Sequence, residues 1–222
     1  MQTTLNFLLV DDHPLQTDAY QAILDFVKED WELTFQHAHS CQEVYEFATN
    51  HPMRDEIDFV LLDLSLPAYA EKNLFSGHDL ACLINQQMPK AHIIFLTSHF
   101  EALMLYNLYH DFQPAGILVK SDFTGAQLEA YFSELLQGNK IYSPTFLEAK
   151  NKINDSDIFL DKLNRQIMLK LAEGYPSKDL PGFIGLSISA INKRKAKLKE
   201  YFEVENKQDN YIILQARKQG LI

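Results

Sequence analysis

Several side chains that could do chemistry stand at the ends of short apolar runs. They are a pair of carboxylates, a third carboxylate, a hydroxyl and an ammonium, at Asp11, Asp12, Asp63, Thr97 and Lys120. Three carboxylates brought together repel one another unless a cation lies among them, and an all-oxygen site of this kind suits Mg²⁺. Phosphoryl transfer uses such a metal together with a lysine and a hydroxyl, and Asp63 would be the nucleophile that forms an acyl phosphate.

Each of these residues, taken singly, also has an ordinary structural interpretation. Asp11 and Asp12 could cap the helix that follows them. Thr97 could be a turn residue and Lys120 a solvated strand end. The functional interpretation is favoured because all five residues fall where a predicted strand ends, and only the second predicted strand ends without such a residue.

The elements that must position these residues alternate along the first part of the chain. Runs such as FVLL, without polar alternation, are typical of strands buried on both faces, and the segments between the runs carry apolar residues at helical spacing. Five strands alternating with five helices predict an α/β fold with a doubly wound parallel sheet. The carboxyl ends of the strands meet at one edge of such a sheet, where ligands collect.

Charge and composition divide the chain in two. Residues up to 150 carry 7 basic and 21 acidic side chains, a net charge of −14, whereas the remainder carries 13 and 9, a net charge of +4. We predict a first domain at 1–139, a linker at 140–157 that is rich in polar residues, and an all-α domain at 158–222. The asymmetry suggests that the two domains have different partners.

Other features exclude whole classes of protein. No apolar run approaches the roughly 20 residues of a membrane span, and the first residues lack the pattern of a signal peptide. We therefore expect a soluble, cytoplasmic protein without a membrane partner. Cys41 and Cys82 lack the spacing of a metal site or a disulfide framework, so we expect them to pack as small apolar residues.

The second domain has helix-terminating and helix-capping residues at the spacing of a helix-turn-helix. Gly174 suits a helix end, and Ser177 and Ser187 suit helix starts. The helix predicted from about 188 to 202 places Ile191, Leu198 and Phe202 on one face. Its other faces carry the polar and basic residues Asn192, Lys193, Arg194, Lys195, Lys197 and Lys199. A second helix with an exposed basic surface is the plan by which this motif enters the major groove.

Residues 5–139 resemble the receiver domain of the bacterial response-regulator family. The similarity lies in the segments LLVDDHP, LLDLSLP, IIFLTS and GILVKSD. It implies a two-component system in which a sensor histidine kinase phosphorylates Asp63. It also implies Mg²⁺ as the cofactor, held by Asp11, Asp12, Asp63 and the main-chain carbonyl of Ser65, with Thr97 and Lys120 contacting the phosphoryl group.

Three positions depart from the receiver pattern. The loop AYAEKNLFSG, after Pro67, is longer than in the family. Ile117 stands at the switch position, where an aromatic residue usually turns inward together with Thr97. Ser121 replaces a proline that often follows the lysine. The acceptor chemistry does not depend on any of these three positions, whereas Ile117 removes the usual aromatic switch.

Residues 160–222 resemble the LuxR/NarL-type DNA-binding domain, through LKLAEGYPSKDL, IGLSISAINKRKAKL and ARKQGLI. The resemblance implies promoter DNA as a partner and a homodimer formed through the last helix. Asn192 and Lys193 would face base edges, and Lys195, Lys197 and Lys199 would meet phosphates. Arg194 is the sixth residue of this helix that we predict to bind DNA. Pro181 lies in the first helix of the motif, so we expect that helix to be short or to start late.

These patterns predict a transcriptional regulator of a two-component system that responds to phosphorylation and is not an enzyme. A second hypothesis keeps the DNA binding and makes the receiver a dimerisation or protein-interaction module that needs no phosphate. A third hypothesis, a metal-dependent phosphatase, ranks lower. Ser65 stands two residues after Asp63, where such an enzyme in this fold would carry a second carboxylate.

Overall fold

The computed structural model describes residues 4–28, 31–204 and 208–222. The chain forms two compact units. The first contains Met1–Ser98 and Leu108–Pro144, and the second contains His99–Asn107 and Thr145–Ile222. The boundary between the units therefore falls inside a single helix, α4 (Ala102–Phe112).

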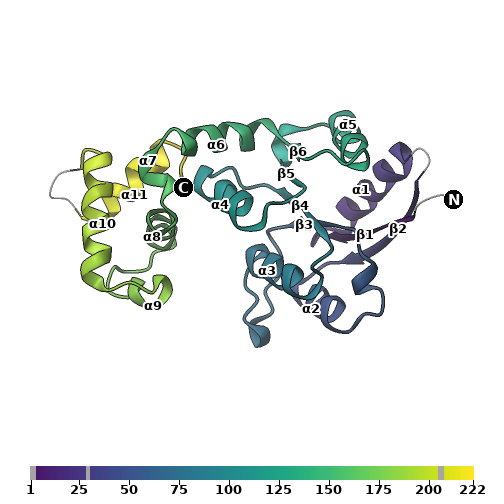
Figure 1. Ribbon diagram of the computed structural model, residues 1–222, viewed down its shortest axis with the longest axis horizontal. Helices are drawn as coiled ribbons and strands as arrows, with labels where there is room; N and C mark the ends of the chain where they lie inside the picture. Colours follow the sequence, from purple (N-terminus) through teal and green to yellow (C-terminus); the bar gives the residue numbers. More distant parts are fainter. Residues whose placement is uncertain (1–3, 29–30, 205–207) are drawn as a thin grey trace. The chain divides into compact units, whose positions relative to one another are not determined.

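A parallel sheet of six strands forms the centre of the first unit, in the order β2-β1-β3-β4-β5-β6 (Figure 1). The strands are β1 (Thr4–Val10), β2 (Glu32–Ala38), β3 (Phe59–Asp63), β4 (His92–Thr97), β5 (Gly116–Val119) and β6 (Ile141–Tyr142). The prediction of a parallel α/β fold is confirmed, and the predicted count of five strands is short by one. The sixth strand, β6, has only two residues, too few to show a hydrophobic period.

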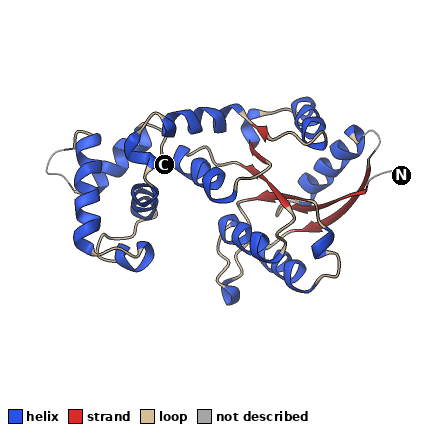
Figure 2. Ribbon diagram, in the orientation of Figure 1, coloured by secondary structure: helices blue, strands red, loops and turns tan. Residues whose placement is uncertain are grey.

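Helices cover both faces of this sheet (Figures 1 and 2). α1 (Pro14–Val27) and α5 (Gly125–Leu136) lie on one face, and α2 (Cys41–Asn50) and α3 (Gly77–Gln87) lie on the other. Alternate residues of the central strands point to opposite faces, so both faces need apolar side chains. One core cluster joins the sheet to α1 and α5 and includes Phe7, Leu9, Leu24, Leu61, Ile94, Leu96, Leu118 and Phe132.

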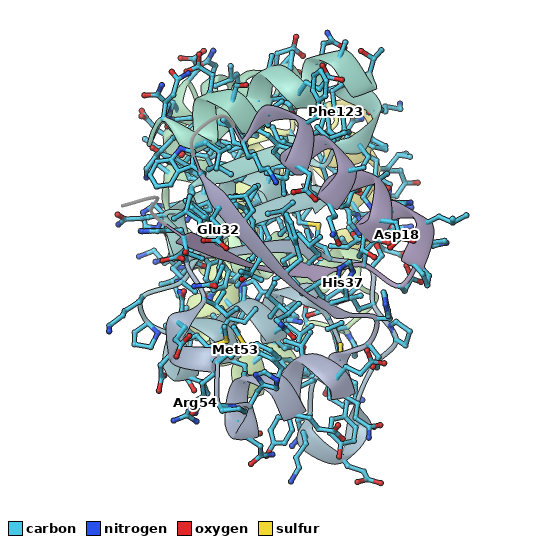
Figure 3. All side chains as sticks on the ribbon, turned by 90° about the vertical axis from the view of Figure 1, so that its right-hand side faces the viewer. Asp18, Glu32, His37, Met53, Arg54 and Phe123 are labelled. Atoms are coloured by element: carbon cyan, nitrogen blue, oxygen red, sulfur yellow. The ribbon has the colours of Figure 1, made fainter. Side chains whose placement is uncertain are left out.

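β2 is the edge strand nearest the viewer in Figure 3, where Glu32 and His37 mark its length. Its residues are mostly half-buried, in contrast to the fully buried ends of β1 and β3. An edge strand has a neighbour on one side only, which explains why WELTFQHA shows polar alternation while FVLLD does not.

Side-chain caps fix where the helices begin. Ser40 accepts a hydrogen bond from the Glu43 amide at the start of α2. Ser76 caps α3 in the same way by accepting from the Asp79 amide. These caps hold the helices that follow the β2 and β3 strand ends at a fixed position.

The extended loop after β3 is an ordered hairpin. Tyr69 and Leu74 pair as an antiparallel bridge, and Asn73 turns the chain with a left-handed backbone at φ 56°. The Tyr69 ring packs edge-on against Tyr45 of α2 with centroids 5.8 Å apart, and the Lys72 ammonium lies 5.2 Å from the centre of the same Tyr45 ring. The extra residues thus form a fixed element beside the end of β3.

The described part of the second unit is helical apart from its loops (Figure 2). Besides the first half of α4, its helices are α6 (Pro144–Asn154), α7 (Asp157–Leu160), α8 (Lys162–Ala172), α9 (Leu180–Ile184), α10 (Ile188–Tyr201) and α11 (Asp209–Lys218). The segment predicted as a linker, 140–157, contains β6 and α6. None of the helices in the described ranges has the length and apolar character that crossing a membrane requires.

Candidate functional site

The predicted chemistry-bearing residues meet at the carboxyl edge of the sheet. Val10 pairs with Leu62, so that Asp11 and Asp63 are the next residues of two adjacent strands. Asp63 pairs with Leu96, the residue before Thr97. Thr97 in turn pairs with Val119, the residue before Lys120. The parallel register therefore brings these residues to one edge of the sheet, where the long Lys120 side chain reaches from the end of β5 to Asp63 and Asp11.

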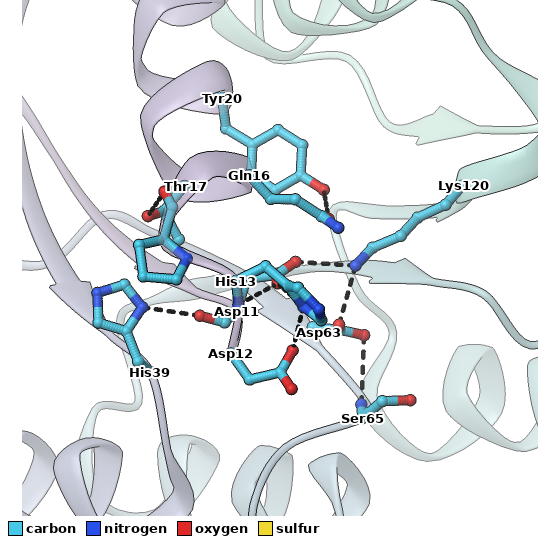
Figure 4. Close-up of polar contacts among 11 residues, drawn as sticks. Asp11, Asp12, His13, Gln16, Thr17, Tyr20, His39, Asp63, Ser65 and Lys120 are labelled. Carbon is cyan, nitrogen blue, oxygen red and sulfur yellow. Dashed lines mark hydrogen bonds and ion pairs between the residues drawn. The ribbon is translucent and has the colours of Figure 1, made fainter.

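Lys120 links two of the three carboxylates, as Figure 4 shows. Its ammonium nitrogen lies 2.8 Å from Asp11 Oδ2 and 2.9 Å from Asp63 Oδ2. Asp11 is fully buried and Asp63 is 4% exposed. Buried carboxylates are costly unless they are paired, so this ammonium is what permits two of them to lie side by side. We call Asp11, Asp12 and Asp63 the acidic cluster.

The electrostatics of the cluster shift the pKa values of two neighbours. Burial lowers the pKa of the Lys120 ammonium, but its hydrogen bonds to Asp11 and Asp63 outweigh that effect, so the pKa is raised. Burial raises the pKa of Tyr20 to about 12, against a lowering effect of Lys120. The Tyr20 hydroxyl donates to Gln16 Oε1 at 2.9 Å. Both groups therefore keep their protons over the neutral range.

Asp11 and Asp12 could hold a cation together with His13. Ligand atoms of these three residues lie within 4.8 Å of one another. Asp12 is partly exposed, and its Oδ1 lies 2.6 Å from His13 Nδ1. Hard carboxylate oxygens beside solvent suit a divalent cation that keeps some of its waters, so the residues fit a site of the Mg²⁺ type.

Two histidines beside the cluster were not predicted. His13 follows the acidic pair directly, and that adjacency was the available signal. His39, just after β2, places Nδ1 2.8 Å from the main-chain oxygen of Asp11 (Figure 4). The second strand was predicted to end without a chemistry-bearing residue, and the structure places His39 directly after it. The contact is to a main-chain atom, which leaves no pattern in the side chains.

The remaining predicted residues lie around the acceptor. The Ser65 amide donates to Asp63 Oδ1 at 3.2 Å, which orients the carboxylate and places the backbone of Ser65 beside it. Thr97 is fully buried at the end of β4. Ile117 is also fully buried, in register with Phe95 and Tyr142 of the neighbouring strands. Ile117 thus belongs to the packed interior of the sheet.

The second unit contains the predicted helix-turn-helix geometry. α9 has only five residues with Pro181 in its first turn, which confirms the expectation of a short first helix. Gly185 then turns the chain at φ 73°, a conformation that disfavours a side chain. Ser187 caps α10 by accepting from the Ala190 amide. The exposed residues of α10 recur at helical spacing: Ile188, Ser189, Asn192, Lys193, Ala196, Lys197, Glu200 and Tyr201.

Three of the six predicted DNA-contacting residues bond inside the helical unit instead. Lys195 is 8% exposed, and its ammonium contacts Asp209 and Ser177. Lys199 Nζ lies 3.4 Å from the other oxygen of Asp209. The pKa of Asp209 is lowered because these hydrogen bonds and charges outweigh its burial, which alone would raise it. For Lys195, burial conflicts with the predicted phosphate contact.

Arg194 is the third of these residues. Its guanidinium bonds Asp161 Oδ2 at 2.6 Å and Asn164 Oδ1 at 2.9 Å, joining α10 to the start of α8. Burial would raise the pKa of Asp161, but the hydrogen bonds from Arg194 and the Leu163 amide hold it below its ordinary value. Arg194 therefore fixes the angle of α10 within the unit.

The fold and this site define a class of protein. A family model described as the response regulator receiver domain matches residues 7–128, just over half of the chain, and the chain belongs to that family. It is not a family of catalytic enzymes. The match contains the acidic pair, the acceptor aspartate, the threonine and the lysine of the strand ends. No curated protein matches the chain.

Among solved structures, the chain is similar over nearly its whole length to the response regulator RcsB. The structure of two RcsB dimers bound to two parallel DNAs has 18% sequence identity to the present chain and a TM-score of 0.62. The similarity covers 97% of the present chain and 98% of the RcsB chain. RcsB from Salmonella enterica serovar Typhimurium, bound to promoter P1flhDC in the presence of phosphomimetic BeF3-, has 20% identity and a TM-score of 0.62. The similarity covers 95% of the present chain and 97% of the RcsB chain. At this identity the likeness shows the fold, helical domain included.

Proposed function

We propose that the chain is a DNA-binding transcriptional regulator that a sensor histidine kinase switches by phosphorylating Asp63. The observation that carries the proposal is the ammonium of Lys120 held between the buried carboxylates of Asp11 and Asp63. An acceptor carboxylate, a cation beside it and a partly exposed acidic pair are the parts that phosphoryl transfer to an aspartate requires.

The chain's own residues can perform each part of the transfer. An oxygen of Asp63 attacks the phosphorus, forms a new P–O bond and releases the donor imidazole as the P–N bond breaks. Lys120, which bonds Asp63 Oδ2 at 2.9 Å, balances the charge of the phosphoryl oxygens. Asp11, Asp12, Asp63 and the Ser65 carbonyl would hold Mg²⁺, which when bound neutralises oxygens of the phosphoryl group.

The fold similarity to RcsB supports DNA as the partner of the second unit. Both RcsB structures described above contain DNA, and the first contains RcsB dimers. We extend this to the present chain as a homodimer that binds promoter DNA, with α10 in the major groove. The exposed Asn192 and Lys193 would face base edges, and Lys197 would meet a phosphate.

The first test is phosphate uptake measured by intact mass. With Mg²⁺ and acetyl phosphate we expect wild type to gain one labile phosphate of about 80 Da, because acetate can leave as the imidazole does. Asp63→Asn lacks the nucleophile and should gain none. Asp18→Asn, at an exposed position of α1, is the matched control and should behave as wild type. Full uptake by Asp63→Asn would disprove the assignment of the acceptor.

The second test measures how DNA affinity depends on salt. A variant that makes one phosphate contact fewer should have a slope of log K against log salt that is smaller by about 0.9. We expect Lys197→Gln to reduce the slope by this amount while the protein keeps its stability. Lys195→Gln should instead destabilise the helical unit, because Asp209 loses its buried partner. If Lys195→Gln lowers the slope without loss of stability, the assignment of Lys195 as a structural residue is wrong.

A second candidate is favoured by Ile117. Because this residue is aliphatic and fully buried in the sheet, the receiver lacks the aromatic side chain that usually reports phosphorylation. The receiver would then be a dimerisation or protein-interaction module of a DNA-binding regulator that needs no phosphate. Equal operator affinity of wild type and Asp63→Ala, with and without acetyl phosphate, would favour this candidate.

A further inference from the structure

The imidazole of His39, the first residue after β2, lies against the main chain of the acidic cluster (Figure 4). Its Nδ1 is 2.8 Å from the main-chain oxygen of Asp11. A carbonyl oxygen can only accept a hydrogen bond, so Nδ1 carries the proton and donates it. The bond joins residues 28 positions apart in the sequence and ends on the peptide that links Asp11 to Asp12.

This side chain completes the ladder between β1 and β2. Val10 pairs with Ala38, and the Asp11 amide still donates to the Ala38 oxygen at 3.2 Å. A continued parallel ladder would next bring a main-chain amide to the Asp11 oxygen. However, β2 ends at Ala38 and Ser40 already caps α2, so the donor at this oxygen is the His39 side chain. Asp11 is fully buried, and a buried carbonyl without a donor is costly.

His39 is itself held through its main chain. Its amide donates to Glu43 Oε2 at 2.8 Å, and the Glu43 amide donates to the Ser40 hydroxyl oxygen at 3.2 Å. Glu43 lies in the first turn of α2. The two bonds fix the chain between β2 and α2, so the imidazole starts from a fixed backbone and can hold the Asp11–Asp12 peptide in one orientation.

We propose that His39 is a positioning residue of the cation site, which sets the place of the Asp12 carboxylate by holding the peptide before it. The inference rests on the proposed function, because it concerns the Mg²⁺ that the acidic cluster would hold. The Asp11 carboxylate is buried and bonded by Lys120. The Asp12 carboxylate is partly exposed, and the partner of its Oδ1 is His13, whose side chain is 67% exposed. The position of the Asp12 carboxylate therefore depends on its main chain.

Three substitutions of His39 separate hydrogen bonding from packing. The side-chain nitrogen of asparagine is as many bonds from the main chain as Nδ1 of histidine, and that of glutamine is as many as Nε2. His39→Asn therefore keeps a donor at the place of Nδ1, His39→Gln displaces the donor by one bond, and His39→Ala removes it. Because the asparagine and glutamine variants are both polar amides, their comparison holds even if the alanine variant folds poorly.

The first measurement is the dissociation constant of Mg²⁺ in the full chain, from an NMR titration of the Asp12 main-chain amide. Groups that orient metal ligands contribute about 10- to 100-fold to affinity, so we expect His39→Gln and His39→Ala to bind Mg²⁺ at least about tenfold more weakly. His39→Asn should bind as wild type does. His37→Ala is the control, because His37 is exposed on β2 and bonds Gln21 of α1 at 3.0 Å (Figure 3). Equal affinities of the asparagine and glutamine variants would overturn the inference and leave the proposed function standing.

The second measurement is the rate of phosphate uptake from acetyl phosphate against Mg²⁺ concentration. In His39→Gln we expect half of the maximal rate at a Mg²⁺ concentration about tenfold higher, with the maximal rate kept, because Asp63 and Lys120 are untouched. Unfolding midpoints in EDTA should agree between His39→Asn and His39→Gln. A lower midpoint of His39→Gln, or a lower maximal rate with unchanged half-saturation, would overturn the positioning role. Wild type that binds Mg²⁺ without taking up phosphate would overturn the proposed function alone, and wild type that binds no Mg²⁺ would overturn both.

Discussion

Lys120 is the residue on which the electrostatics of the acidic cluster depends. It bonds both buried carboxylates, and those bonds raise the pKa of its ammonium against the effect of burial. A raised pKa means that the charged form is stabilised by folding, so this contribution is present below the ordinary lysine pKa and is lost as the pH rises through the raised value. At neutral pH the cation is therefore permanent.

Replacing Lys120 by methionine should separate its structural role from that of a metal. Removing one partner of a buried ion pair costs about 3–5 kcal/mol, so we expect Lys120→Met to lower the free energy of unfolding by that amount without Mg²⁺. Added Mg²⁺ should stabilise the variant more than wild type, because the released carboxylates bind the ion more tightly. Denaturant unfolding with EDTA and with Mg²⁺ measures both effects.

Lys28→Met is the matched control for this experiment. Lys28 pairs with Asp25 at 3.0 Å in an exposed ion pair of α1, which contributes less than about 1 kcal/mol. Its stability should hardly change, and Mg²⁺ should affect it as it affects wild type. Equal stability of Lys120→Met and Lys28→Met would contradict the interpretation of Lys120.

At the scale of elements, the start of α3 lies against the end of β3 beside the acceptor. The Gly77 amide donates to the Leu64 oxygen at 3.1 Å. A Cβ at position 77 would lie 2.4 Å from the Leu64 Cα and 3.0 Å from the Asp63 oxygen. Because the nearest atom belongs to the backbone, no side-chain rotation can relieve the contact. Glycine at this position therefore lets the extended loop close against the acceptor.

Gly77→Ala should accordingly damage both stability and chemistry. We expect a loss of about 1–3 kcal/mol from overpacking and a clear reduction in the rate of phosphate uptake, since the backbone that carries Asp63 must shift. Gly125→Ala is the control, because a Cβ there meets nothing within 4 Å. Rapid mass measurements after addition of acetyl phosphate give the rates. Wild-type uptake by Gly77→Ala would mean that the loop and the acceptor move independently.

The acceptor site could be predicted because its residues each follow an apolar strand in the sequence, and a parallel sheet aligns the ends of its strands at one edge. Asp63 and Lys120 could be found in this way, whereas the His39 contact could not, because it joins distant segments through a main-chain atom. Lys195 was assigned to DNA from a run of basic residues. Its spacing from Ile191 and Leu198, at four and three residues, places it on the buried face, and that signal was available in the sequence.

At the scale of the whole molecule, two compact units share one helix and differ in charge. The first 150 residues carry a net charge of −14 and the rest +4. Trp31, the one tryptophan, packs against the core cluster of the first unit. The helices α6–α11 lie in the second unit, apart from Pro144 at the start of α6. Tryptophan fluorescence and far-UV circular dichroism therefore report different combinations of the two units during unfolding.

Asp209→Asn should make the two signals separate. The lowered pKa of Asp209 means that its pairing with Lys195 stabilises the second unit above the ordinary aspartate value of 3.8, and that this is lost as the pH falls through the lower folded value. At pH 7 we expect a loss of about 1–3 kcal/mol in the variant, seen by circular dichroism and not by Trp31 fluorescence. The difference between variant and wild type should close below about pH 4.

The control for this experiment is Asp179→Asn, at an exposed position without a side-chain cap bond, which should leave both signals unchanged. The chain passes from one unit to the other within α4, so the degree to which they unfold separately measures how strongly that helix couples them. If Asp209→Asn shifts both transitions equally, the units unfold as one cooperative body, and a local change in α11 is carried to the first unit. If only the circular dichroism transition shifts, the coupling through α4 is weaker than the stability of either unit.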